Sequence, residues 1–235
     1  MAPVREARRA GRVCRRILRT FSSRPPERIR HTLGPPRHLR RCLCGAPFLL
    51  REDMKFTKAR TGRGYPDTFG CPPIRDFVMR YMDAAKVSVD PFARNSSLAT
   101  YTNDLNPDTS AQYHMDAVEF MEMLAKQAIV ADLVLFDPPY SPRQMKECYD
   151  AIGFKPTTKD TQNARLYAEC RKVIRKIVSP GAVVLTFGWN SAGMGSGFEA
   201  EELLLVSHGS AHNDTICLAE RMTQQQICLL DAHVA

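Results

Sequence analysis

Long hydrophobic runs are absent from this sequence. No stretch of the 235 residues reaches the ~18 consecutive apolar residues of a transmembrane helix, so we expect no membrane partner. A secretory signal is also missing, and the eight cysteines have neither the spacing of a zinc site nor that of a disulfide framework. We therefore expect a cytoplasmic protein with reduced thiols and no bound metal.

Lysine is missing from the first quarter of the chain. Residues 1–54 contain 14 arginines, no lysine and 4 acids, a net charge of +10. Residues 55–235 contain 19 basic and 21 acidic side chains, a net charge of −2. The total of +8 therefore belongs to the front segment, and it does not by itself predict a nucleic-acid surface on the rest.

The two parts of the chain also differ in their expected order. Residues 1–53 have recurrent prolines and weak apolar periodicity, so we predict a largely disordered, arginine-rich extension. A transit peptide, a nucleic-acid-binding arm and an over-extended reading frame with its true start at Met54 all remain open. We assign residues 54–235 to one folded domain of ordinary size.

Strand-like and helix-like segments alternate along residues 54–235. Four segments have the apolar periodicity of helices: 74–85, 117–126, 143–151 and 162–178. Six segments have the pattern of strands: 86–89, 100–103, 132–136, 182–187, 201–207 and 215–221. This alternation predicts an α/β fold with a mostly parallel sheet and helices on both faces, in which the last two strands could form a hairpin.

The strongest chemical signal follows the apolar strand at 132–136. Asp137, Pro138, Pro139 and Tyr140 stand at its carboxyl end, where ligands bind in open α/β sheets. Asp137 and the Pro138 carbonyl can accept hydrogen bonds, and the prolines stiffen the turn that presents them. Tyr140 offers a flat face to a heterocycle. An ordinary turn after a buried strand is the alternative interpretation.

This tetrapeptide resembles motif IV of amino-methyltransferases that use S-adenosylmethionine. The resemblance implies that Asp137 and the Pro138 carbonyl hold a substrate NH2 group while Tyr140 stacks on the base. Two acceptors in the plane of the amine would favour pyramidal nitrogen and aim its lone pair at the sulfonium methyl. The candidate catalytic residues are therefore Asp137, Pro138, Pro139 and Tyr140.

The run Asp90-Pro91-Phe92 resembles motif I of the same superfamily, in which a glycine-rich turn usually follows. Here Ala93, Arg94 and Asn95 stand in that turn, although a loop close to a ligand prefers glycine and asparagine tolerates positive φ better than most residues. The resemblance implies that Asp90 lies near the methionine amino group of the cofactor. The candidate cofactor-binding residues of this segment are Asp90, Pro91, Phe92, Ala93 and Asn95.

Three further segments complete the predicted cofactor site. Asp104 ends the second strand and could accept both ribose hydroxyls, with Leu105 packed on the adenine ring. Asp116 precedes the helix at 117–126, and the resemblance implies a bond to the adenine amine, although a plain helix N-cap is equally consistent. Thr68 and Phe69 weakly resemble a segment that closes over the methionine end, with a loop packed on the sheet as the alternative.

The ordered set of motifs is similar to that of adenine-specific DNA methyltransferases, especially small phage and prophage enzymes of bacterial or phage-infected cells. The resemblance implies a Rossmann-like class I methyltransferase fold, a seven-stranded, mostly parallel sheet with an antiparallel C-terminal hairpin. It also implies S-adenosylmethionine as cofactor, DNA as partner and transfer to N6 of adenine, in a restriction-modification system among other roles. A ribosomal-RNA guanine-N2 methyltransferase and a catalytically silent subunit of the same fold remain as alternatives.

Two weaker sequence signals concern how the substrate would bind. Trp189 follows the strand at 182–187 and could stack in the substrate cleft or pack in the core. A basic face for DNA could be formed by Lys155, Lys159, Arg165, Arg171, Lys172, Arg175 and Lys176. A solvated helix face explains the same run of charges. The oligomeric state and the recognised sequence stay open.

Overall fold

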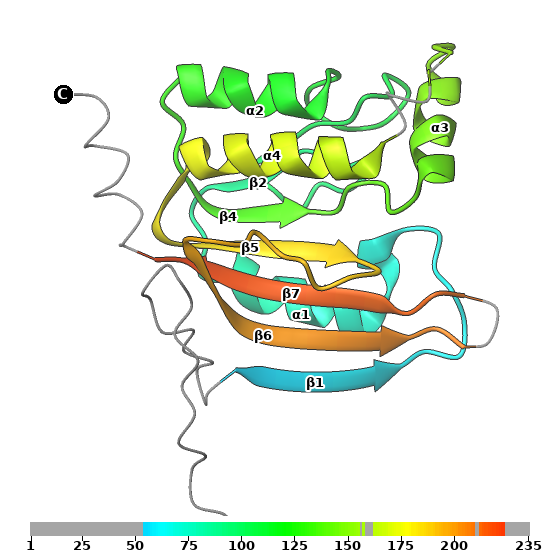
Figure 1. Ribbon diagram of the computed structural model, residues 1–235, viewed down its shortest axis with the longest axis vertical. Helices are drawn as coiled ribbons and strands as arrows, with labels where there is room; N and C mark the ends of the chain where they lie inside the picture. Colours follow the sequence, from blue (N-terminus) through cyan, green and yellow to red (C-terminus); the bar gives the residue numbers. More distant parts are fainter. Residues whose placement is uncertain (1–53, 156, 158–161, 210–211, 224–235) are drawn as a thin grey trace, which may run out of the picture. The chain divides into compact units, whose positions relative to one another are not determined.

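A seven-stranded sheet organises the computed structural model, which describes residues 54–155, 157, 162–209 and 212–223 (Figure 1). The strands are β1 Lys55–Arg60, β2 Ser88–Asp90, β3 Tyr101–Thr102, β4 Ala131–Phe136, β5 Val178–Gly188, β6 Phe198–Ser207 and β7 Thr215–Met222. The helices are the 3-10 turn η1 Thr68–Gly70 and α1 Pro72–Met82, α2 Ala117–Lys126, α3 Pro142–Ala151 and α4 Asn163–Ile177. The predicted extension at 1–53 lies outside the described residues.

The strands are arranged in the order β1-β6-β7-β5-β4-β2-β3. Strand β7 runs antiparallel to its neighbours β5 and β6, and every other neighbouring pair is parallel. The sequence-based prediction of a mostly parallel sheet of seven strands with an antiparallel C-terminal hairpin is therefore confirmed. In the described part of the chain, no helix combines the length and the apolar character that crossing a bilayer requires.

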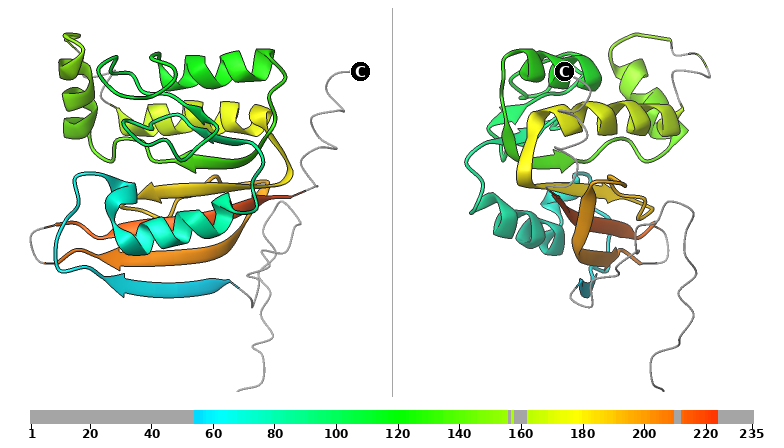
Figure 2. Two further views of the ribbon diagram at one scale, coloured as in Figure 1. Left: turned by 180° about the vertical axis from the view of Figure 1, so that it is seen from behind. Right: turned by 60° about the vertical axis from the view of Figure 1, so that its left-hand side comes forward.

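Alternating side chains of β4 build two cores, one on each face of the sheet. Val134 and Phe136 pack with α2 and α4, whereas Leu133 and Leu135 pack with α1. Figure 1 shows α2 and α4 together, and the view from behind in Figure 2 shows α1 in front of β5 and β7. All four β4 side chains are at most 1% exposed, as expected for a strand that is covered on both faces.

Two features of the sheet differ from the prediction. Strand β1 was not expected, because its sequence Lys-Phe-Thr-Lys-Ala-Arg is polar and all but one of its residues are exposed. It pairs in parallel with β6 at the edge of the sheet, a contact that lies far away in the sequence. Strand β5 begins at Val178, where a helix was predicted, because a register shift opposite β4 and the positive φ of Gly181 carry the strand through Ser179–Gly181.

Candidate active site

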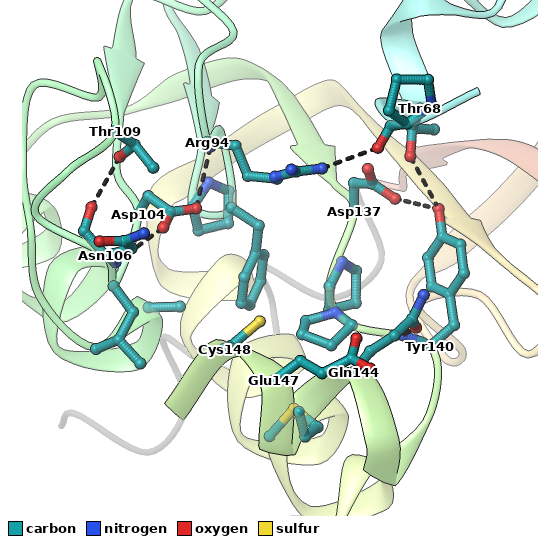
Figure 3. Close-up of a pocket in the computed structure, with 18 of the residues that line it drawn as sticks. Thr68, Arg94, Asp104, Asn106, Thr109, Asp137, Tyr140, Gln144, Glu147 and Cys148 are labelled. Carbon is teal, nitrogen blue, oxygen red and sulfur yellow. Dashed lines mark hydrogen bonds between the residues drawn. The ribbon is translucent and has the colours of Figure 1, made fainter. Parts of the chain in front are cut away.

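A cavity of about 740 Å³ lies at the carboxyl ends of the parallel strands (Figure 3). A cavity of this size is typical of a small-molecule site. Eleven of the predicted catalytic and cofactor-binding residues line it: Thr68, Pro91, Phe92, Asn95, Asp104, Leu105, Asp116, Asp137, Pro138, Pro139 and Tyr140. Segments separated by up to 72 positions along the chain therefore meet around one space.

Three selected residues do not line the cavity. Asp90 is fully buried at the end of β2, and Ala93 is 4% exposed, with its N–H bonded to the Asn103 carbonyl at 2.8 Å. Phe69 packs edge-to-face on Phe187, with ring centroids 5.2 Å apart, in the core on the α1 side. The η1 turn therefore directs Thr68 to the cavity and packs Phe69 against the core, so the structure does not bring Phe69 to the cavity as the sequence predicted.

Asp90 carries an unsatisfied carboxyl oxygen. Its Oδ1 accepts the N–H of Phe92 at 3.0 Å, while its buried Oδ2 has no hydrogen-bond partner among the described residues. Removal from water raises the pKa of Asp90 well above its usual value, and the charges of Asp137 and Asp104 raise it further. A buried oxygen without a donor is costly, so Asp90 is suited to a proton or to a donor supplied by a ligand.

The turn after β2 holds the carboxylate of Asp104. The N–H of Arg94 donates to Asp104 Oδ2 at 3.1 Å, and the N–H of Asn106 donates to Oδ1 at 2.9 Å. The residue with positive φ in this turn is Arg94, at 50°, and not Asn95, whose side chain accepts the N–H of Ser110. A carboxylate oxygen has two lone pairs, so Asp104 keeps acceptor capacity for two hydroxyl groups.

Asp116 is the N-cap of α2. Its Oδ1 accepts the N–H groups of Val118 at 2.8 Å and Glu119 at 3.3 Å, so the N-cap interpretation is confirmed. Asp116 also lines the cavity, and the cap engages Oδ1 alone. The same side chain can therefore both begin the helix and face a ligand.

A chain of three side chains surrounds the end of β4. The Tyr140 hydroxyl donates to Asp137 Oδ1, and the Thr68 hydroxyl oxygen lies 3.4 Å from the Tyr140 hydroxyl oxygen (Figure 3). Burial raises the pKa of Asp137 to about 6, although bonds from Tyr140 and Thr68 and the positive charge of Arg94 oppose the rise. Burial and the charge of Asp137 also raise the pKa of Tyr140, which keeps its hydroxyl protonated as a donor. At neutral pH, Asp137 is therefore an ionised acceptor held in a fixed orientation.

Residues that the sequence analysis did not select fix the Asp-Pro-Pro-Tyr turn. Gln144 Oε1 accepts the N–H of Tyr140 at 2.6 Å, and Asn163 Nδ2 donates to the Pro139 carbonyl at 2.7 Å. Ser141 caps α3 by accepting the N–H of Gln144 at 3.2 Å. The run Ser-Pro-Arg-Gln contains a signal for this role, because serine at the N-cap, proline at N1 and glutamine at N3 is a typical helix start.

Aromatic rings line the cavity near Asp137. The ring of Tyr140 meets Trp189 edge-on, with centroids 5.6 Å apart and planes at 63°. Trp189 is 41% exposed and lines the cavity together with Tyr65, so it belongs to the cleft and not to the core. These rings offer apolar surface to a planar group beside the carboxylate.

Several residues of the proposed basic face contact neighbouring groups of the fold. Arg175 turns toward the carbonyls of Met194 and Ser196, and Arg171 lies over the ring of Tyr167. Other members make ion pairs: Arg165 with Glu169, and Lys176 with Glu122. Lys159 lies outside the described residues, and none of the other members, which also include Lys155 and Lys172, lines the cavity. Four of the seven members therefore have partners within the fold, since i,i+4 and loop neighbours lie within reach, and the role of this face in DNA binding stays a prediction.

No family model matches this sequence, and no curated protein does. Several solved structures resemble the fold. TrmN from Thermus thermophilus is 15% identical, with 64% of this chain and 48% of that chain covered and a TM-score of 0.44. The N-methyltransferase NodS from Bradyrhizobium japonicum is 8% identical, with 68% and 99% covered and a TM-score of 0.43. A SAM-dependent methyltransferase from Agrobacterium tumefaciens is 12% identical, with 63% and 60% covered and a TM-score of 0.39.

These similarities concern the fold alone. The chain spans about half the length of the TrmN structure that it matches. The strand order and the antiparallel strand β7 described above are those of a Rossmann-like α/β fold, with the mostly parallel seven-stranded sheet and antiparallel C-terminal hairpin that the sequence predicted.

Proposed function

We propose that this chain is an S-adenosylmethionine-dependent methyltransferase that transfers a methyl group to the exocyclic N6 amine of adenine in DNA. The observation that carries the proposal is the pair formed by Asp137 and Tyr140 at the end of β4. An ionised carboxylate in a turn of fixed shape faces a cavity that also holds Asp104 and Asp116. Such an acceptor beside aromatic rings suits a planar amine better than it suits an alcohol, which would need a stronger base.

The residues around the cavity fit the cofactor. Asp104 can accept the two ribose hydroxyls, and Asp116 and Leu105 line the cavity where the adenine ring would lie. Asp90 does not line the cavity, so its orphaned Oδ2 would reach the methionine ammonium group through a water molecule. Ala93 and Arg94, which stand where glycines are usual, leave the site open. The Ala93 side chain is buried, and Arg94 adopts the positive φ that the turn requires.

The cofactor supplies an electrophilic methyl group on a sulfonium. The chain supplies orientation and acceptors, since Asp137 and the Pro138 carbonyl would take the two N–H bonds of the substrate amine. The Tyr140 hydroxyl prevents rotation of the Asp137 carboxylate, and its ring, together with Trp189, would contact the base. A carboxylate with a pKa of about 6 can accept the amine proton and release it to water at neutral pH. Placing the amine in this cavity requires the base to leave a duplex stack, which costs a few kcal/mol.

The experiment is a methylation assay with the full chain. Labelled S-adenosylmethionine is incubated with unmethylated DNA or with ribosomal RNA, and the modified nucleoside is identified by mass spectrometry. We expect N6-methyladenine in DNA, its loss in Asp137→Ala and its retention in Asp76→Asn, an exposed acid on α1. N2-methylguanine in RNA alone would replace the DNA assignment with the RNA one. Cofactor binding without transfer to either would identify a silent subunit.

A further inference from the structure

Arg94 bridges two loops across the cavity. Its N–H holds Asp104 (Figure 3). Its guanidinium Nη1 donates to the Pro66 carbonyl at 3.0 Å and pairs with Asp67 Oδ1 at 2.9 Å. The turn after β2 is thereby tied to the loop that precedes η1. The residue keeps a positive φ of 50° although it is not glycine. Such conformations persist where the surrounding structure requires them, and they cluster at ligand sites.

Arg94 is also electrostatically distinct. Among the described residues that line the cavity, it is the one lysine or arginine, while five lining residues are acids: Asp104, Asp108, Asp116, Asp137 and Glu147. Its charge reaches Asp137, whose pKa it lowers. A ligand carboxylate that enters this acidic cavity would find no other permanent cation among these lining residues.

The position of Arg94 matches one part of the cofactor. The side chain extends from the turn that holds Asp104, the proposed ribose acceptor, toward Asp137, the proposed amine acceptor (Figure 3). If Asp104 accepts the ribose and Asp137 accepts the amine, the sulfonium centre would lie between these two acids, and the methionine arm would start there. The Arg94 side chain is 59% exposed, and its hydrogen bond to Pro66 and its ion pair with Asp67 both use Nη1, so its other N–H groups can turn to a ligand.

We propose that the Arg94 guanidinium binds the α-carboxylate of the methionine moiety of S-adenosylmethionine. This inference rests on the proposed function. Arginine presents a planar fork that matches a carboxylate, and charge-assisted bonds of this kind are stronger than neutral ones. Asp67 and the Pro66 carbonyl hold the fork at the mouth of the cavity before the ligand arrives. The departure from a glycine-rich turn is then a specific recognition element of this chain.

The test compares two ligands that differ only in the carboxylate. Calorimetry on the full chain would measure dissociation constants for S-adenosylmethionine and for decarboxylated S-adenosylmethionine, in wild type, Arg94→Gln, Arg94→Lys and Asp67→Asn. Arg94→Gln should weaken binding of S-adenosylmethionine roughly tenfold to a hundredfold, the range for a hydrogen bond to a charged group. It should leave decarboxylated S-adenosylmethionine within about threefold of wild type, which also shows that the variant is folded. Arg94→Lys should lie between wild type and Arg94→Gln.

Other results would overturn the inference. If Arg94→Gln weakens both ligands equally, and Asp67→Asn also weakens both, Arg94 serves only to tie the loops. If wild type binds the decarboxylated ligand as tightly as the intact one, the carboxylate is not recognised. Failure of wild type to bind either ligand would instead overturn the proposed function itself, so the two failures are distinguishable.

Discussion

Replacing Asp137 with asparagine should abolish methyl transfer and, at the same time, stabilise the fold. Burial raises the pKa of Asp137 from its usual 3.8 to about 6, so the folded state binds its proton more tightly than the unfolded state does. As pH rises past 3.8, the unfolded chain releases this proton first, and folding is progressively penalised until the folded carboxyl ionises near pH 6. Since one pH unit corresponds to 1.36 kcal/mol, the full penalty is about 3 kcal/mol above that pH.

The asparagine variant does not ionise and should escape this penalty. Urea unfolding at pH 8 should show Asp137→Asn more stable than wild type by up to about 3 kcal/mol, and the difference should shrink to about 0.5 kcal/mol at pH 4. Asp76→Asn, on the exposed face of α1, should stay within about 0.5 kcal/mol of wild type at both pH values. Equal stability of wild type and Asp137→Asn at pH 8 would refute the claim that this carboxylate is held in a desolvated site.

Three other changes have definite outcomes. Tyr140→Phe removes a donor that lowers the pKa of Asp137, so the pH midpoint of kcat/KM, near 6 in wild type, should rise; an unchanged profile would rule out this coupling. Asp116→Ala should cost about 1 kcal/mol in urea unfolding by removing the cap of α2, while Asp116→Ser keeps that stability; lower cofactor affinity in both would place the carboxylate at the adenine. Gly193→Ala places a Cβ 2.5 Å from the Glu220 carboxylate, so it should lower the free energy of unfolding by more than Gly195→Ala does. The Cβ of Gly195→Ala meets open space, and its positive φ alone costs about 1–2 kcal/mol. Equal losses in urea unfolding would contradict the packing.

Several parts of the site could be predicted because their signals are local. An apolar strand that ends in Asp137 is visible in the sequence, and so is an acid at the start of the α2 helix. Parallel strands bring their carboxyl ends to one edge of the sheet, so the strand pattern alone indicated that these acids would meet. The cavity contains both Asp104 and Asp137 for this reason.

Other parts depend on contacts between distant segments. Strand β1 is mostly polar and exposed, and it forms because β6 offers an edge that local propensity does not reveal. The neighbours Thr68 and Phe69 separate into cavity and core because of the surfaces that the η1 turn meets. Arg94 was noted only as a departure from glycine, and its role emerges from the loop around Asp67, which lies 27 positions earlier in the chain.

The central claim is that the carboxylate of Asp137 orients an amine for transfer. Its most direct test is a single-turnover measurement of methyl transfer to N6 of adenine, with saturating S-adenosylmethionine and unmethylated DNA, in wild type and Asp137→Asn. The account predicts a rate at least about a hundredfold lower in the variant, within the range for a positioned proton acceptor, with an unchanged dissociation constant for the cofactor. A variant that transfers the methyl group within about threefold of the wild-type rate would contradict it.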